Sequence, residues 1–470
     1  MASSYQIAVE RMYALGHELA QTPSHKFDLA HMRVLLAALE NPERRFPSVL
    51  IAGTNGKGST ASTLASILLA AGLRTGLYTS PHLLRINERI RINGEEITDG
   101  KFALLHDLVE RTAERLIEDG ELPWHPSFFE MLTAIAFEHF ATGETEIAVL
   151  EVGMGGRLDA TNVVEPRVSV IADVALDHQK FLGNTVTEIA REKAGIIRPS
   201  GVVVTLPQSP AANDVLGNSI LEQDARAVSA VQYVPPVSPG AQEYFGRKSV
   251  TTEETLRLRS GRAPVTEEER KPISRYPLQV MGSEILVETP LVGRHQLRNV
   301  ALAIAAAEEL SKQGFGITPE AIERGIRETR WPGRFQVIPA RSGQPELVLD
   351  VAHNPAGAWA LRSTLSSYYE DRRIVFVFGA MRDKAIGEIS EILFPLAECV
   401  IATCAENPRS ATPEEIREAA SRMRTEMELS RDVRSALERA RVLATTDGIV
   451  VVTGSIYVVG EAMRALGVPV

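Results

Sequence analysis

A lysine set among glycines, between a buried strand and a helix, carries the clearest chemical signal in this 470-residue chain. Residues 48–60 read SVLIAGTNGKGST, where the apolar run predicts a strand and the residues from Ser59 onward predict a helix. A turn of this kind aims backbone N–H groups and a helix N-terminus at a phosphate. Lys57 would neutralise the terminal phosphates, and the hydroxyl of Ser59 or Thr60 could face Mg²⁺.

The glycine turn departs from a regular Walker A motif. The usual first glycine is replaced by Ile51, and Gly58 separates Lys57 from the two hydroxyl residues. An ordinary structural turn is the alternative interpretation. The lysine, the hydroxyls and the flanking strand and helix nevertheless agree with a phosphate site. The departure from the Walker A pattern limits the kinds of nucleotide-binding enzyme to which the chain could belong.

A second block, residues 151–162, reads EVGMGGRLDATN. Glu151 ends an apolar strand, where an unpaired carboxylate is costly, and this position suits a metal-binding carboxylate of the Walker B type. The glycines allow the following loop to approach a ligand closely. Asp159 and Thr161 are among its polar groups. A purely structural glycine loop is the alternative.

Three further polar residues follow predicted strands or lie on a helix. Ser80 ends the strand after the phosphate loop and could give a hydroxyl to magnesium, although a turn residue before proline is the simpler interpretation. His178 lies beyond another strand end, near enough in a doubly wound sheet to share a metal with Glu151. Lys193 lies on a predicted helix, with a surface ion pair as the plain alternative.

The second half of the chain contributes polar residues of its own. Arg334 follows a Pro-Gly turn and is suited to a phosphate, while Asp350 and His353 emerge from a buried strand, where unpaired polar groups would be costly. Taken one at a time, each could be a cap or a turn residue.

Strand and helix patterns alternate along most of the chain, which predicts an α/β fold with parallel sheets. We expect a P-loop-type parallel-sheet ATPase domain over residues 1–295, with an inserted loop at about 235–275. A smaller Rossmann-like α/β domain is expected over residues 296–470. The predicted strands include 147–152, 168–173, 202–206, 346–350, 373–378, 399–402 and 448–453, and the predicted helices include 101–119, 128–142, 296–313, 355–368, 384–396, 412–427 and 431–444.

The composition excludes several classes of protein. A net charge of −10 argues against generic nucleic-acid binding. The two cysteines, Cys399 and Cys404, imply no disulfide framework. We find neither a signal-peptide pattern nor an apolar run long enough to span a membrane, so we expect a cytoplasmic protein.

Together these blocks resemble the folylpolyglutamate synthase and dihydrofolate synthase family, within the Mur-ligase-like ATP-dependent amide ligases. The matching segments, in order, are GTNGKGST at 53–60, SPHL at 80–83, FFE at 128–130, EVGMGGRLDATN at 151–162, LDH at 176–178, EKAGII at 192–197, HQLRN at 295–299, PGR at 332–334 and DVAHNP at 350–355. Met154 replaces the more usual leucine, which is a mild change.

The resemblance implies roles for individual residues. ATP would be held by Asn55, Gly56, Lys57 and Gly58 of the loop, together with Asn299, Arg334 and Asp350. The magnesium ligands would be Ser80, Glu151 and His178. Lys193 matches a lysine that is often carbamylated in the superfamily, where it helps to position a second magnesium ion. The segments that would line the pterin-side pocket are Ser127, Phe128, Phe129 and Glu130, and Asp159, Ala160 and Thr161.

The implied reaction activates a carboxylate with ATP as an acyl phosphate, which the amine of L-glutamate then attacks. Dihydropteroate, a folate, or both would be the acceptor, and the resemblance implies a monomer. A Mur-type ligase acting on a peptidoglycan precursor is a second hypothesis. A nucleotide-binding regulator that has lost catalysis is a third, against which the set Lys57, Glu151, His178 and Lys193 argues.

Overall fold

The computed structural model describes residues 3–16, 29–236, 272–341 and 343–470. It divides into two compact units. The first contains Met1–Val234, Leu278–Ile285 and Arg298–Glu328, and the second contains Pro235–Pro277, Leu286–Leu297 and Thr329–Val470. Nearly all of the predicted insertion at 235–275 lies outside the described residues.

The first unit is built on an eight-stranded sheet with the order β4-β3-β2-β5-β1-β6-β7-β8. Strands β2, β5, β1, β6, β7 and β8 run parallel, while β3 and β4 add an antiparallel edge. Its strands are β1 (Ser48–Ala52), β2 (Thr75–Tyr78), β3 (Ile90–Ile92), β4 (Glu95–Glu96), β5 (Ile147–Glu151), β6 (Val168–Ile171), β7 (Val202–Thr205) and β8 (Arg226–Ser229).

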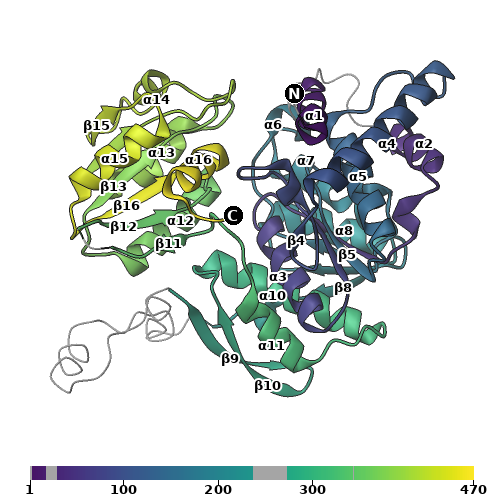
Figure 1. Cartoon of the computed structure of the whole chain (residues 1–470). Helices are drawn as coiled ribbons and strands as arrows, with labels where there is room; N and C mark the ends of the chain where they lie inside the picture. Colours follow the sequence, from purple (N-terminus) through teal and green to yellow (C-terminus); the bar gives the residue numbers. More distant parts are fainter. Residues whose placement is uncertain (1–2, 17–28, 237–271, 342) are drawn as a thin grey trace. The chain divides into compact units, whose positions relative to one another are not determined.

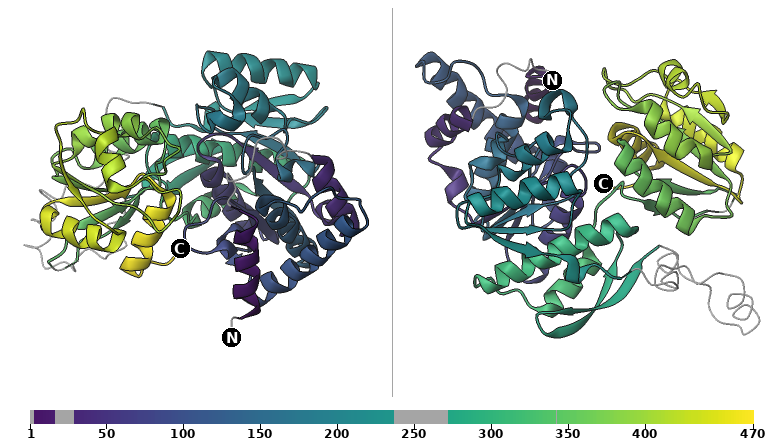
Figure 2. Two further views of the ribbon diagram at one scale, coloured as in Figure 1. Left: turned by 90° about the horizontal axis from the view of Figure 1, so that it is seen from above. Right: turned by 180° about the vertical axis from the view of Figure 1, so that it is seen from behind.

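Helices cover both faces of this sheet (Figures 1 and 2). Leu50 and Leu150 share one core with helices α4, α5, α7 and α8, and residues alternating with them face α3, which contacts β1, β2 and β5. The helices of this unit are α1 (Ser4–Ala14), α2 (Leu29–Ala38), α3 (Lys57–Ala70), α4 (Asp99–Glu118), α5 (Phe128–Thr142), α6 (Gln179–Leu182), α7 (Val186–Ala194), α8 (Pro210–Glu222) and α11 (Pro319–Glu328).

Helix α11 packs on the phosphate-loop helix α3 at unusually short range. A Cβ atom on Gly325 would lie 2.4 Å from the Ile67 Cα, and the Ser66 hydroxyl donates to the Gly325 carbonyl at 2.7 Å. Only glycine permits this approach of two helix backbones. Helix α3 is consequently buried along most of its length.

Three elements have residues in both units. Helix α10 (Arg294–Lys312) begins in the second and continues in the first, and β9 (Ser274–Val280) pairs with β10 (Ser283–Thr289) in a two-stranded sheet. At the far end of α10, Glu309 is 1% exposed and is bonded by Arg226 of β8 and by Lys312. This buried carboxylate ties α10 to the edge of the first sheet.

The second unit has a six-stranded sheet with the order β11-β12-β16-β13-β14-β15, in which only β11 is antiparallel. Helices α12, α13 and α14 share a core on one face, and α15 and α16 contact the strands as well. The elements are β11 (Gln336–Ile338), β12 (Glu346–Leu349), β13 (Ile374–Phe378), β14 (Cys399–Ala402), β15 (Glu426–Leu429), β16 (Ile449–Thr453), α12 (Pro355–Tyr368), α13 (Ile386–Leu393), α14 (Pro413–Ala419), α15 (Val433–Ala444) and α16 (Ile456–Leu466).

The α/β fold predicted from the sequence is confirmed, with one wrong element. The helix expected over 412–427 ends at Ala419, and Glu426–Leu429 forms the edge strand β15 instead. Its EMEL sequence alternates charged and apolar residues, which suits a half-exposed edge strand.

Candidate active site

The phosphate loop connects β1 to α3, as its sequence predicts. Gly56 precedes the first residue of α3 with a left-handed φ of 82°. A Cβ atom at this position would lie 2.2 Å from Oδ1 of Asn299, a residue of α10 in the same unit. Because glycine has no side chain, it allows both the left-handed turn at position 56 and the close approach of the Asn299 amide. Ser59 and Thr60, in the first turn of α3, are buried.

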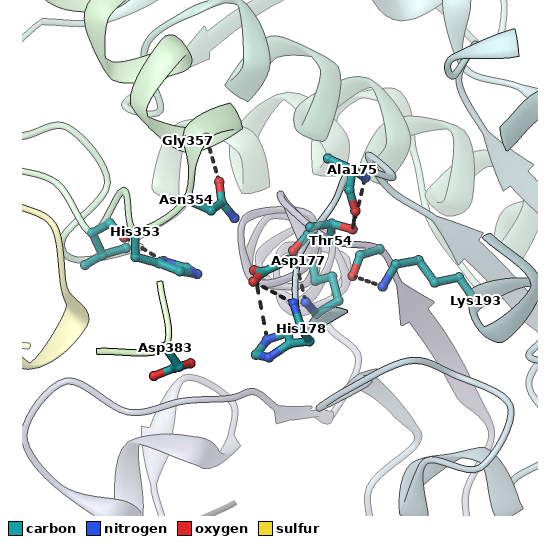
Figure 3. Close-up of polar contacts among 12 residues, drawn as sticks. Thr54, Ala175, Asp177, His178, Lys193, His353, Asn354, Gly357 and Asp383 are labelled. Carbon is teal, nitrogen blue, oxygen red and sulfur yellow. Dashed lines mark hydrogen bonds and ion pairs between the residues drawn. The ribbon is translucent and has the colours of Figure 1, made fainter. Parts of the chain in front are cut away.

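The segment that follows β6 holds this loop in place. The N–H groups of Thr54 and Asn55 both donate to the Asp173 carbonyl, at 2.6 and 3.3 Å. The Thr54 hydroxyl donates to the Ala175 carbonyl at 2.9 Å and accepts from its N–H at 3.0 Å (Figure 3). The loop is thus fixed before any nucleotide binds.

Two lysines converge on carbonyls of the loop. The Lys57 ammonium donates to the Thr54 carbonyl at 3.3 Å, and Lys193 of α7 donates to the Gly53 carbonyl at 2.8 Å (Figure 3). Lys193 is only 3% exposed. Burial, and then the positive charge of Lys57, lower the pKa of Lys193 from its ordinary value of 10.5 to about 7, against the opposing effects of nearby aspartates. A substantial share of Lys193 is therefore neutral amine at pH 7.

Ser80 and Glu151 lie together at the carboxyl ends of the neighbouring strands β2 and β5. The Ser80 N–H donates to Glu151 Oε2 at 3.1 Å, and Glu151 is buried. His178, with a left-handed φ of 50°, lies beside Asp177, whose carboxylate accepts from its N–H at 2.8 Å and approaches Nε2 at 3.9 Å (Figure 3).

This donor set fits a magnesium ion in part. The buried Glu151 carboxylate offers the oxygen ligands that Mg²⁺ prefers, and Ser80 lies next to it, whereas the imidazole of His178 is a softer ligand. Across the described ranges, no group of three or more His, Cys, Asp and Glu side chains is arranged to hold a metal ion.

The glycine loop after β5 is folded around a buried carboxylate. Asp159 accepts from the N–H of Met154 at 2.9 Å and from the N–H of Thr161 at 3.0 Å, and the Thr161 hydroxyl donates to it at 2.5 Å. Burial raises the pKa of Asp159, opposed by these hydrogen bonds. Ala160 is buried beside them, and a Cβ on Gly156 would lie 2.6 Å from the Glu192 carbonyl of α7.

Helix α5 begins at the second predicted substrate segment. Ser127 is its N-cap and forms a capping box with Glu130. Phe129 packs on Gly153, since a Cβ there would lie 2.5 Å from the ring, and its centroid is 5.9 Å from that of Tyr78. Phe128 is 3% exposed. These contacts bring Phe129 against the loop that contains Asp159.

In the second unit, Asp350 organises the turn after β12. Its carboxylate accepts from the N–H groups of Phe335 and Ala352, at 2.8 and 2.9 Å. Burial raises the pKa of Asp350, and the nearby Arg334 opposes this effect. His353 Nδ1 lies 2.9 Å from the Val351 carbonyl (Figure 3). Arg334 and Asp350 are thus neighbours, as are Asp350 and the start of α12.

The structure also assigns contacts that sequence reasoning missed. Asp173 and Asp177 oppose the lowering of the Lys193 pKa by their charge, and His31 of α2 contacts Glu130 at 3.3 Å. Asp173 ends the predicted strand 168–173 and Asp177 follows it, so the strand-end rule placed both aspartates near the site but did not indicate Lys193 as their partner. His31 had no local signal, because its partner is 99 residues away.

Comparisons with known proteins decide the family. Residues 333–456 match the Mur ligase, glutamate ligase domain. The dihydrofolate synthase/folylpolyglutamate synthase of Bacillus subtilis (strain 168) is 32% identical over 440 residues, which cover 93% of this chain and 94% of the relative. The chain belongs to the folylpolyglutamate synthase and dihydrofolate synthase family.

A solved structure of this family agrees over the whole fold. Mycobacterium tuberculosis folylpolyglutamate synthase complexed with ADP and AMPPCP has a TM-score of 0.81 at 31% identity, covering 98% of this chain and 99% of that one. The chain spans about half the length of a Halobacterium salinarum relative, a probable bifunctional folylpolyglutamate synthase/dihydropteroate synthase, which is 36% identical over 433 residues, or 91% of this chain and 48% of the relative.

None of the described helices is both long and apolar enough to span a membrane.

Proposed function

We propose that this chain uses ATP to join L-glutamate to dihydropteroate, to reduced folates or to both, releasing ADP and phosphate. The observation that carries the proposal is the phosphate loop, on which Lys57 and Lys193 converge through the Thr54 and Gly53 carbonyls. The two activities named for the Bacillus relative support the choice of acceptor.

The chemistry proceeds in two balanced steps. A carboxylate oxygen of the acceptor attacks the γ-phosphorus of ATP, the bond to the β-phosphate oxygen breaks, and ADP leaves. The α-amine of glutamate then attacks the acyl phosphate carbon, loses a proton and displaces phosphate. Because two anions meet in the first step, cations such as Lys57 stabilise the charge that develops on the transferring group.

We assign the ATP contacts to Asn55, Gly56, Lys57, Gly58 and the hydroxyls of Ser59 and Thr60 in the first unit, with Asn299 beside Gly56. Arg334, Asp350 and His353 are the candidates in the second unit. The close approach of Asn299 to Gly56 and of Arg334 to Asp350 supports these assignments.

Ser80, Glu151 and His178 would hold magnesium, which when bound neutralises phosphate charge and orients the phosphates. Lys193 is proposed to add CO₂ at its neutral amine, forming a C–N bond and releasing one proton. The resulting carbamate would be an anionic ligand for a second ion. The burial of the amine and its lowered pKa support this modification.

The acceptor is proposed to bind beside the start of α5 and the glycine loop, at Ser127 to Glu130 and Asp159 to Thr161. The contact of Phe129 with Gly153 supports a common site for the two segments. We also propose that the protein is a monomer and is located in the cytoplasm. Light scattering of the purified protein tests its oligomeric state.

The test is ADP release by the purified protein with Mg-ATP and L-glutamate, comparing dihydropteroate with tetrahydrofolate as acceptor. Release with one acceptor alone identifies a dihydrofolate synthase or a folylpolyglutamate synthase, and release with both identifies a bifunctional enzyme. No release with either, from folded protein that binds ATP, would refute the proposed reaction and favour a Mur-type or regulatory role.

A further inference from the structure

His31 contacts one of the two segments of the proposed acceptor site, at Glu130, and also the residues that lead into that segment, at Trp124. It lies on α2 and is only 7% exposed. Its Nε2 lies 3.0 Å from the Trp124 carbonyl, and its Nδ1 lies 3.3 Å from Oε1 of Glu130. The imidazole also stacks on the Trp124 ring, with centroids 5.5 Å apart and planes 22° apart. The His31 side chain thus fixes both the segment that leads into α5 and the first turn of α5.

Glu130 has both carboxylate oxygens engaged by the protein. Oε1 faces His31, while Oε2 accepts from the Ser127 N–H at 2.8 Å and from its hydroxyl at 2.6 Å. Each partner therefore holds the other in position. These contacts give Glu130 the role of fixing the start of α5.

Both ring nitrogens of His31 face acceptors, a carbonyl on one and a carboxylate on the other. Because each nitrogen has its own partner, the two contacts together fix the orientation of the imidazole ring.

We propose that His31 is a positioning residue for the acceptor substrate, acting through Glu130 on the first turn of α5. This inference rests on the proposed function. The turn carries Phe128 and Phe129, and Phe129 packs directly on Gly153 of the glycine loop. Loss of the His31 contacts releases the segment from Trp124 to Glu130, so the wall formed by Phe129 shifts while the phosphate loop stays in place.

The experiment compares His31→Ala, His31→Gln and Glu130→Gln with the wild type. We measure kcat, the KM for each substrate, and binding of dihydropteroate or tetrahydrofolate by calorimetry with AMPPCP present. His31→Ala is expected to raise the KM and Kd of the acceptor about tenfold, and His31→Gln, which keeps one donor, about threefold. The KM for ATP and kcat should change less than twofold.

A double-mutant cycle tests whether His31 acts through Glu130. Adding Glu130→Gln to His31→Ala should weaken acceptor binding no further than the worse single variant. His139→Ala is the control, because it removes a half-buried histidine from the last turn of α5, the helix whose first turn contains Glu130. This control should leave the acceptor KM within twofold of the wild type.

Two results would overturn the positioning role in an active wild-type enzyme. One is an unchanged acceptor KM in folded His31→Ala, and the other is an equal change in every KM and in kcat. If His31→Ala does not fold, His31→Gln and Glu130→Gln decide the question by the same criteria. A wild type that neither turns over nor binds either acceptor would instead refute the proposed function, and the positioning role with it.

Discussion

Replacing Lys193 by methionine should stabilise the ligand-free protein at neutral pH while abolishing the proposed ligase activity. The folded-state pKa of about 7, against 10.5 for an exposed lysine, means that the unfolded chain binds more protons between these two values. The free energy of unfolding of the wild type therefore rises with pH across that window. Methionine has a similar length but no charge, so the variant avoids the free-energy cost of burying a charged group.

The size of the effect follows from the shift. A shift of about 3.5 pKa units corresponds to about 5 kcal/mol when lysine is fully protonated, and linkage leaves about 4 kcal/mol at pH 7 and about 2 kcal/mol at pH 9. Methionine also leaves the buried Gly53 carbonyl without its donor, which costs roughly 1–3 kcal/mol. The variant should gain about 2 kcal/mol at pH 7 and about none at pH 9.

Urea unfolding in CO₂-free buffer measures this difference. The three tryptophans include Trp124 in the first unit and two others in the second. Trp331→Phe and Trp359→Phe in both proteins therefore leave Trp124 to report on the unit that contains Lys193. A difference in unfolding free energy that does not change between pH 7 and 9 would refute the reasoning, because it would mean that Lys193 titrates alike in both states.

Three further predictions concern the phosphate loop and the anchor of α10. Lys57→Ala should reduce turnover at least a hundredfold with an unchanged circular dichroism spectrum; near-normal ADP release would contradict the role of Lys57. Gly56→Ala should weaken calorimetric ATP binding at least tenfold, because its Cβ meets Asn299 at a left-handed φ of 82°; binding within twofold of the wild type would show that the loop tolerates a side chain there. Glu309→Gln should lower the free energy of unfolding by about 1–3 kcal/mol through the loss of its bond to Arg226, and an unchanged urea midpoint would show that the bond contributes little.

Local patterns predicted the elements that contain their own signals. Helix α5 begins and ends where the sequence predicts, because Ser127 and Glu130 form a capping box and the apolar run fills one helix. The order of strand, glycine turn and helix around the phosphate loop was likewise predicted from the local sequence. The helix expected beyond Ala419 was wrong, since helix-forming residues there were overridden by pairing of β15 with β14.

Contacts between distant segments could not be read in this way. Lys193 donates to the Gly53 carbonyl, although the two residues are 140 positions apart in the chain. The burial of Lys193 sets the charge of its amine. The sequence identified Lys193 as a candidate but left a surface ion pair open. Nothing local signals that Asn299 approaches Gly56, because that contact depends on how α10 packs on the first sheet. The role of each candidate in catalysis stays a prediction until the variants are measured.

The packing of α11 on α3 has a consequence for biosynthesis. Ser66 and Gly325 are 259 residues apart in the chain. At a synthesis rate of 5–20 residues per second, α3 waits roughly 13–50 s for the helix that covers it. During that interval the apolar face of α3 is exposed to chaperones and to neighbouring nascent chains. A fragment that stops near residue 295 would keep this exposed face permanently, whereas one that retains 298–328 would bury it.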